Sequence, residues 1–249
     1  MLSSKRVGLG ERIVLVHGFT QTCETWDGIA QQLKSEFELL AIDAPNHGDS
    51  SDVSLNLESG ARSIIEVGGE ATYVGYSMGG RFCLTAAFAE PKTVKRLVLV
   101  STSAGIEERD LRNKRLTSDE ELAKRVEQIG VAQFIDEWLT NPLFSGLTKE
   151  NNQRSVRLKN TAIGLSSSLR LCGAGRQQPT WTKLNELEMP VLVMAGENDS
   201  KYVELAEKMV QAIGTNASLQ VVKNSGHTPH IEQADVFAES IRSFVKQTS

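Results

Sequence analysis

The stretch "VGYSMGGR", Val74 to Arg81, decides the fold, because it places a serine between glycines at the end of an apolar run. Small residues on both sides of Ser77 allow a sharp turn from a strand into a helix, with the hydroxyl exposed above the sheet. An apolar run, "ATYVGYS", precedes the turn, and an Ala-rich helical pattern, "MGGRFCLTAAFAEP", follows it. The context predicts a catalytic elbow at Ser77. Hydrolysis by a serine at such an elbow does not require an arginine four residues later, so the presence of Arg81 needs a separate explanation.

Short apolar runs rich in β-branched residues alternate with helical patterns on both sides of this elbow. Continuous apolar runs with little alternation are typical of strands that are covered on both faces. The expected strands are "RIVLVHG", "ELLAIDAP", "ATYVGYS", "VKRLVLVST", "MPVLVMAGEND" and "LQVVKNSGH". Their alternation with helices predicts an α/β fold whose mostly parallel central sheet is flanked by helices.

The alternation stops between about Ile106 and Trp181, where the chain is rich in Glu, Arg, Lys, Asn and Leu. Helical periodicity continues there in "DEELAKRVEQIGVAQFIDEWL" and "NQRSVRLKNTAIGLSSSLRL". We therefore predict a helical cap at residues 106–181, inserted after the fourth strong strand, with residues 1–105 and 182–249 as the core. Two long crossover helices are the alternative.

Composition narrows the class of protein. The 249 residues carry a net charge of −4 without a basic block, and no window approaches the ~18 apolar residues of a membrane helix. We expect neither nucleic acid nor a membrane as partner. Three scattered cysteines without metal spacing favour the cytoplasm, and four histidines without ligand spacing give no reason to expect a metal. A monomer and a homodimer both stay open.

The partners that a catalytic serine needs follow Ser77 in the order typical of this elbow. Asp199 comes just past the strand in "VLVMAGENDS", with Glu197 as the weaker candidate acid, and His227 lies in the loop of "VVKNSGHTPH". The carboxyl ends of parallel strands share one edge of a sheet, so the three side chains can meet there. The sequence predicts a triad of Ser77, Asp199 and His227.

The run "VLVHGF" after the first strong strand supplies the next part of the site. Its glycine lets the backbone approach a ligand, so the N–H of Phe19 can pair with that of Met78 as an oxyanion hole. We expect His17, His47 and His230 to organise loops rather than to catalyse.

These motifs together resemble the α/β-hydrolase superfamily. The segments "HGF", "DAPNHGDS", "GYSMGG", "GENDS" and "SGHTPH" occur in order over nearly the whole chain, although the usual N-terminal strands look abbreviated. The resemblance implies a fold and a triad, while the function must come from the site.

A narrower resemblance concerns "GYSMGGR", "AGIEERDLRNKR", "WLTNPLF", "RLKNTAIGLSSSLR", "GAGRQQPTW" and "GENDSKY". These segments look like the menaquinone-biosynthesis synthases that form 2-succinyl-6-hydroxy-2,4-cyclohexadiene-1-carboxylate. The resemblance implies a lyase that eliminates pyruvate from a small polycarboxylate, 2-succinyl-5-enolpyruvyl-6-hydroxy-3-cyclohexene-1-carboxylate, without a cofactor. It also implies that Tyr76 and Trp138 line the pocket.

Carboxylates on the substrate explain the arginine at the end of the opening stretch. Arg offers a permanently charged, fork-shaped partner that binds a carboxylate through two hydrogen bonds. The resemblance implies this role for Arg81 and for Arg115 of the cap. A further cap arginine of the family aligns best with Lys159, although Arg157 lies two positions away.

The implied mechanism uses Ser77 as a base. His227, oriented by Asp199, activates the serine, which removes a ring proton, and the N–H groups of Phe19 and Met78 stabilise the resulting enolate. The alternative is a serine hydrolase of small esters, thioesters or C–C bonded diketones, which uses the same residues through an acyl-enzyme or an activated water. A non-enzymatic ligand receptor is the third reading.

Overall fold

A computed structural model describes residues 1–248 and contains one seven-stranded sheet, in the order β1-β3-β2-β4-β5-β6-β7. Only β1 runs antiparallel to its neighbour, and every other pair is parallel. The predicted mostly parallel α/β sheet is therefore confirmed. The strands are β1 (Ser4–Val7), β2 (Glu11–Val16), β3 (Phe37–Ile42), β4 (Ala71–Tyr76), β5 (Val94–Val100), β6 (Val191–Gly196) and β7 (Ala217–Val222).

The first strand was not predicted. The segment "SKRV" carries no apolar run, and its residues are largely exposed. Its extended form depends on antiparallel pairing with β3, where Lys5 lies opposite Ala41. One short strand thus precedes the first strong one, which fits the abbreviated N-terminus expected from the sequence.

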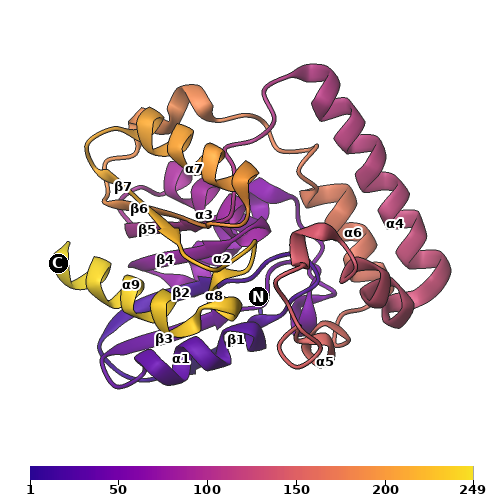
Figure 1. Ribbon diagram of the computed structural model, residues 1–249, viewed down its shortest axis with the longest axis horizontal. Coiled ribbons are helices and arrows are strands. Elements are labelled where there is room, and N and C mark those ends of the chain that lie inside the picture. Colours follow the sequence, from indigo (N-terminus) through magenta and orange to yellow (C-terminus); the bar gives the residue numbers. More distant parts are fainter. Residues whose placement is uncertain (249) are drawn as a thin grey trace.

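Helices cover both faces of the sheet (Figure 1). On one face, α1 (Asp27–Leu33) and α9 (Ala234–Gln247) pack against each other and against the strands. The other face carries α2 (Leu57–Gly68), α3 (Met78–Ala89) and α7 (Ser200–Ile213). Because both faces are covered, every residue of β3, β4 and β6 is buried. The shorter helices are η1 (Cys23–Trp26), η2 (Gly48–Ser50), η4 (Trp181–Glu186) and α8 (Pro229–Glu232).

The segment between β5 and β6 is helical and lies at one side of the sheet, on the right in Figure 1. It contains α4 (Arg109–Trp138), η3 (Pro142–Phe144), α5 (Arg154–Arg157) and α6 (Ala162–Cys172). The long helix α4 packs along α6 around a small apolar cluster of its own. These helices occupy the segment predicted as the cap, and its boundaries stay a prediction.

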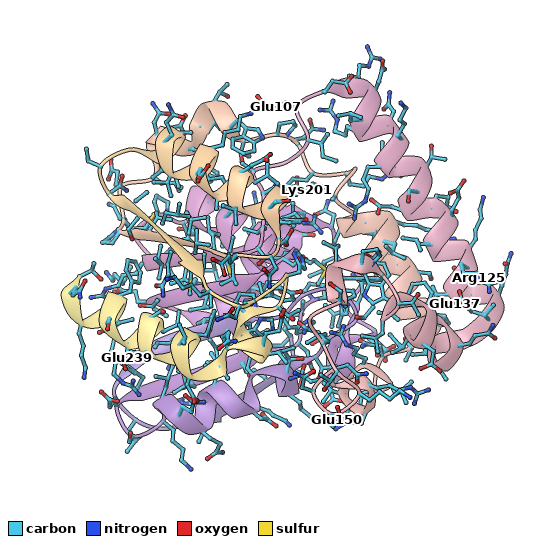
Figure 2. All side chains as sticks on the ribbon, in the orientation of Figure 1. Glu107, Arg125, Glu137, Glu150, Lys201 and Glu239 are labelled. Atoms are coloured by element: carbon cyan, nitrogen blue, oxygen red, sulfur yellow. The ribbon has the colours of Figure 1, made fainter. Side chains whose placement is uncertain are left out.

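A kink divides α4 at Gly130, whose φ of 74° is not helical. The side chain of Arg125 reaches across the kink to Glu137, with N–O distances of 3.0 and 2.6 Å, and Figure 2 shows the two side by side. The kink separates the first part of α4, with Arg115, from the end that carries Trp138. The cap can therefore bring both side chains toward the same pocket.

Among residues 1–248, no helix is both long enough and apolar enough to cross a bilayer. Although α4 has 30 residues, it is rich in Glu, Arg and Lys.

Candidate active site

The elbow between β4 and α3 has the sharp geometry that the glycines predicted. Ser77 has φ 51° and ψ −107°, a sparsely populated conformation for a residue with a side chain. A Cβ on Gly75 would lie 2.4 Å from the carbonyl oxygen of Gly79. A Cβ on Gly79 itself would lie 2.1 Å from the carbonyl oxygen of Val16. Only glycine fits at either position, so these two residues are what permit the turn.

Ser77, His227 and Asp199 lie together although they are far apart in the sequence. His227 Nδ1 lies 2.6 Å from Asp199 Oδ2, and His227 Nε2 lies 3.4 Å from Ser77 Oγ. With its Nδ1–H donated to the carboxylate, the imidazole leaves Nε2 free to accept the serine proton. The longer serine contact is common in enzymes without substrate and shortens when the complex forms. Ser77 can therefore pass its proton to His227, while Asp199 orients the imidazole.

The alternative acid, Glu197, lies outside this arrangement. Its side chain is exposed and accepts a hydrogen bond from the backbone N–H of Asn224 at 3.1 Å. Asp199, in contrast, is buried at the start of α7 and faces the histidine. The geometry therefore favours Asp199 as the partner of His227.

A pocket opens above the serine, between the sheet and the cap segment, and encloses about 810 Å³ when its mouth is included. Ser77 and His227 line it, as do Phe19 and Met78, whose backbone N–H groups are the predicted oxyanion donors. The pocket thus joins the reacting groups to cap residues. Its other lining residues are Tyr76, Arg81, Thr102, Ser103, Arg115, Trp138, Leu143, Phe144, Arg157, Ser168, Leu169, Cys172, Gly173, Ala174 and Tyr202.

Arg81 is a buried cation without a carboxylate partner among residues 1–248. Its residue is 8% exposed, and Nη1 donates a hydrogen bond of 2.7 Å to the carbonyl oxygen of Cys172. Burial lowers the pKa of the guanidinium, although an arginine stays charged near neutral pH. A buried charge without a counter-ion is unfavourable unless a bound anion supplies one. Arg81 is therefore placed to receive an anionic ligand.

Arg157, the second candidate for the further cap arginine, lies in the wall of the pocket. It is fully buried, lines the pocket, and its guanidinium lies 5.5 Å from the ring centroid of Phe144. Nη1 donates to the hydroxyl of Thr20 and Nε to the carbonyl of Asn152, while Nη2 has no hydrogen-bond partner among residues 1–248. Burial lowers the pKa of Arg157 to about 10. The pocket is thus lined by a buried cation whose Nη2 is unpaired in the described part of the chain.

The predicted substrate-binding role of Lys159 is not supported, because the structure places Lys159 outside the pocket. Its Nζ lies 2.6 Å from a carboxylate oxygen of Glu24, and its side chain is 54% exposed. The four-residue helix α5 ends at Arg157, and two positions of helical turn rotate a side chain by about 200°. Arg157 and Lys159 therefore point in different directions.

Arg115 lines the pocket from α4, but its charge is already paired. Nε donates a 2.7 Å hydrogen bond to Asp119, which is buried, while the Arg115 side chain is 41% exposed. The charge of Arg115 is therefore neutralised by Asp119, whereas Arg81 and Arg157 have no carboxylate partner among residues 1–248.

The two predicted aromatic residues both lie in the pocket wall. The ring of Tyr76 is 5.5 Å from that of His227, and Trp138 stacks on Phe134 with an interplanar angle of 16°. Burial raises the pKa of Tyr76, so its phenol stays neutral. The wall beside the imidazole is thus rigid and largely apolar.

Two further aromatic residues, Tyr202 and Phe144, were not singled out from the sequence. Tyr202 packs 4.5 Å from the ring of His227, and Phe144 packs 6.4 Å from it. Tyr202 follows Asp199 by three residues, one turn of α7, and that spacing could have indicated it. Phe144 comes from η3 in the cap, and no local pattern indicates it.

The other three histidines are buried outside the triad. His17 Nε2 accepts a 3.0 Å hydrogen bond from the N–H of Ala44, and burial lowers its pKa to about 4. Burial lowers the pKa of His47 to about 3 and that of His230 well below its usual value. His230 packs 4.3 Å from the ring of Tyr76, and neither of its ring nitrogens has a hydrogen-bond partner in the described part of the chain. All three are neutral in the folded chain near pH 7.

These buried histidines predict a loss of stability in mild acid. Their folded-state pKa values lie below the ordinary 6.5, so the unfolded chain takes up protons first as the pH falls toward 4. Below pH 6.5 each group removes about 1.4 kcal/mol per pH unit from the free energy of unfolding, so three groups remove roughly 4 kcal/mol at pH 5.5. Urea denaturation at pH 7.5 and at pH 5.5 measures the difference.

His230→Phe is the matched variant, because the ring has no hydrogen bonds to lose. It should remove about one third of the pH dependence, since one of three similar groups no longer titrates. Equal unfolding free energies of the unchanged protein at the two pH values would contradict this prediction.

Within residues 1–248, no group of three or more His, Cys, Asp or Glu side chains is arranged to hold a metal ion. Cys172 lines the pocket, but burial raises the pKa of its thiol to about 12. Cys23 and Cys83 are free and buried elsewhere.

Known proteins resemble this chain over nearly its full length. The profile of the alpha/beta hydrolase family matches residues 13–240. A Bacillus subtilis (strain 168) protein, provisionally named 2-succinyl-6-hydroxy-2,4-cyclohexadiene-1-carboxylate synthase, is 31% identical over 94% of this chain and 90% of its own length. A Serratia proteamaculans (strain 568) protein of the same name is 26% identical over 98% of both chains. The structure of MenH from S. aureus superposes with a TM-score of 0.91 and 29% identity, over 98% of both chains.

Proposed function

Because the chain belongs to the alpha/beta hydrolase family, and its relatives carry a synthase name, we propose that its triad performs a lyase reaction. The reaction eliminates pyruvate from 2-succinyl-5-enolpyruvyl-6-hydroxy-3-cyclohexene-1-carboxylate and gives 2-succinyl-6-hydroxy-2,4-cyclohexadiene-1-carboxylate, a step of menaquinone biosynthesis. The substrate is a small molecule with several carboxylates, and the chemistry requires no cofactor.

One observation carries the proposal: two buried guanidinium groups border the pocket that holds the serine, and neither pairs with a carboxylate among residues 1–248. Within that range the printed partner of the Arg81 guanidinium is a carbonyl oxygen, and Nη2 of Arg157 has no hydrogen-bond partner. Carboxylates of the substrate would complete both groups through charge-assisted hydrogen bonds. A pocket built for neutral esters would have no use for such cations, since burying them without an anion is unfavourable.

The triad geometry suits proton removal from carbon. His227, held by Asp199, accepts the hydroxyl proton of Ser77 while the serine oxygen takes the ring proton α to the succinyl carbonyl. The electron pair moves onto that carbonyl oxygen, where the N–H groups of Phe19 and Met78 are proposed to stabilise it. As the ring double bond forms, the C–O bond to the enolpyruvyl group breaks, and the departing enolate takes a proton to become pyruvate. No acyl-enzyme forms.

A serine hydrolase of small esters, thioesters or C–C bonded diketones is the second candidate. The strained elbow and the ordered imidazole favour it, because acyl transfer uses the same arrangement. The two reactions differ in what the substrate carries: the synthase substrate is polyanionic, whereas an apolar ester is not. The arginines of the pocket therefore discriminate between them.

Arg81→Ala should lower kcat/KM for pyruvate release by about 10- to 100-fold, because one charge-assisted contact to a carboxylate is lost. Cleavage of p-nitrophenyl acetate, a neutral ester, should change by less than threefold. Arg81→Lys is the control that keeps the charge without the fork, and it should recover part of the loss. An Arg81→Ala protein that keeps its kcat/KM for both substrates would instead favour the hydrolase.

We further propose the cytoplasm as the compartment, in keeping with relatives that are named for a biosynthetic step. The net charge of −4 offers no attraction to nucleic acid. The sequence leaves both a monomer and a homodimer open.

A further inference from the structure

The loop that carries the Phe19 amide contains a strained turn. The N–H of Gln21 donates to the carbonyl oxygen of Gly18 at 3.2 Å, which makes Phe19 and Thr20 the central residues. Thr20 has φ 68°, whereas Phe19 has no positive φ, a combination typical of a type II turn. Glycine or asparagine normally occupies the position of Thr20 in such a turn, and a β-branched residue there is strained.

Asn160 holds this turn from the cap segment. Its Nδ2 donates to the carbonyl oxygen of Thr20 at 2.7 Å and to that of Arg157 at 3.0 Å. Its Oδ1 accepts from the N–H of Gly48 at 3.0 Å. Asn160 is buried, so water does not compete for these contacts. One amide side chain therefore ties the turn to the end of α5 and to the start of η2.

The hydroxyl of Thr20 is held from the same side. Arg157 Nη1 donates to Thr20 Oγ1, so both the carbonyl and the hydroxyl of Thr20 accept hydrogen bonds from side chains between β5 and β6. A strained conformation persists only where its surroundings fix it. If these contacts were lost, the peptide planes on either side of Thr20 could rotate toward an unstrained turn.

We propose that Asn160 is a positioning residue for the oxyanion hole: it keeps the Gly18–Gln21 turn in the conformation that aims the Phe19 N–H into the pocket. The inference rests on the proposed oxyanion role of Phe19. It holds for the lyase and for ester hydrolysis alike, since both reactions develop negative charge on a carbonyl oxygen. Asn160 itself does not line the pocket.

Asn160→Ala and Asn160→Asp test the proposal. Alanine removes all the contacts, and aspartate keeps the shape but turns a donor into an acceptor that faces two carbonyl oxygens. Both variants should lower kcat by about 10- to 100-fold with KM changed by less than threefold, because a misplaced donor acts on the transition state. Lys159→Ala, a neighbouring exposed residue, is the control and should stay within twofold of the unchanged protein.

A second variant separates positioning from general folding. Thr20→Gly relieves the positive-φ strain, so the turn should keep its conformation with less help from Asn160. The kcat loss caused by Asn160→Ala should therefore be at least threefold smaller in the Thr20→Gly protein than in the unchanged protein. Thermal unfolding of each variant shows whether the chain is folded at the assay temperature.

Each variant is assayed for pyruvate release and for p-nitrophenyl acetate cleavage. If the unchanged protein cleaves only the ester, the proposed lyase function fails while the ester data still test Asn160. A loss confined to KM, or the same kcat loss with Thr20 and with glycine at that position, would overturn the inference. Failure of the unchanged protein to turn over either substrate would contradict both proposals.

Discussion

Replacing Ser77 with alanine should lower kcat for pyruvate release by roughly 10²- to 10⁴-fold, the range that general-base catalysis contributes. The loss should fall on kcat rather than on KM, because the carboxylates of the substrate would still bind Arg81 and Arg157. Alanine keeps a side chain with a Cβ at the strained elbow, but it removes the hydroxyl that lies 3.4 Å from His227 Nε2. Steady-state kinetics with the enolpyruvyl substrate measure both constants.

The role of Ser77 as a base adds a second readout. Mass spectrometry during turnover of the enolpyruvyl substrate should detect only the unmodified chain, because no bond to the serine oxygen forms. Ser166→Ala is the matched control, since Ser166 is buried in α6 and does not line the pocket. An accumulating covalent adduct on Ser77, or full activity of Ser77→Ala, would contradict the mechanism.

Arg157→Ala should lower kcat/KM for pyruvate release by about 10²- to 10³-fold. One charge-assisted contact to a carboxylate accounts for roughly 1.5–3 kcal/mol of this effect, or about 10- to 150-fold. The rest follows because Arg157 also donates to Thr20 and so holds the turn beside the serine. The expected loss is therefore larger than for Arg81, whose other contact is a single carbonyl oxygen.

Arg157→Lys separates the two parts of this effect. Lysine keeps the charge but cannot form the fork that contacts the substrate and Thr20 together. It should therefore recover less than half of the transition-state stabilisation that Arg157→Ala loses, as calculated from kcat/KM. Lys159→Ala supplies the control at the neighbouring surface site. Full activity of Arg157→Ala, or an equal loss in Lys159→Ala, would contradict the placement of the anion site.

Most of the fold could be predicted because its central strands are buried on both faces and therefore appear as continuous apolar runs. The edge strand β7 is partly exposed, but its apolar run was expected as well, so all of β2 to β7 were predicted from the sequence. The first strand could not be predicted, because "SKRV" is extended only through its pairing with β3. Local pattern carries no information about a partner from another part of the chain.

The triad could also be predicted, whereas the cap contacts could not. Ser77, Asp199 and His227 each follow a strand of one parallel sheet, and that topology alone brings them to a common edge. The sequence around Arg157 shows helical periodicity in "NQRSVRLKNTAIGLSSSLRL", and the structure divides this segment into α5, a turn and α6. In that turn, Asn160 hydrogen-bonds to Thr20 and Gly48, which lie far away in the sequence, and the local pattern does not indicate such contacts.

Pyruvate release by the purified protein tests the central claim most directly. The protein is incubated with 2-succinyl-5-enolpyruvyl-6-hydroxy-3-cyclohexene-1-carboxylate, and pyruvate is measured with p-nitrophenyl acetate cleavage in parallel. We predict one pyruvate per substrate consumed, with a kcat/KM far above that for the ester. Ester cleavage without any pyruvate would contradict the account.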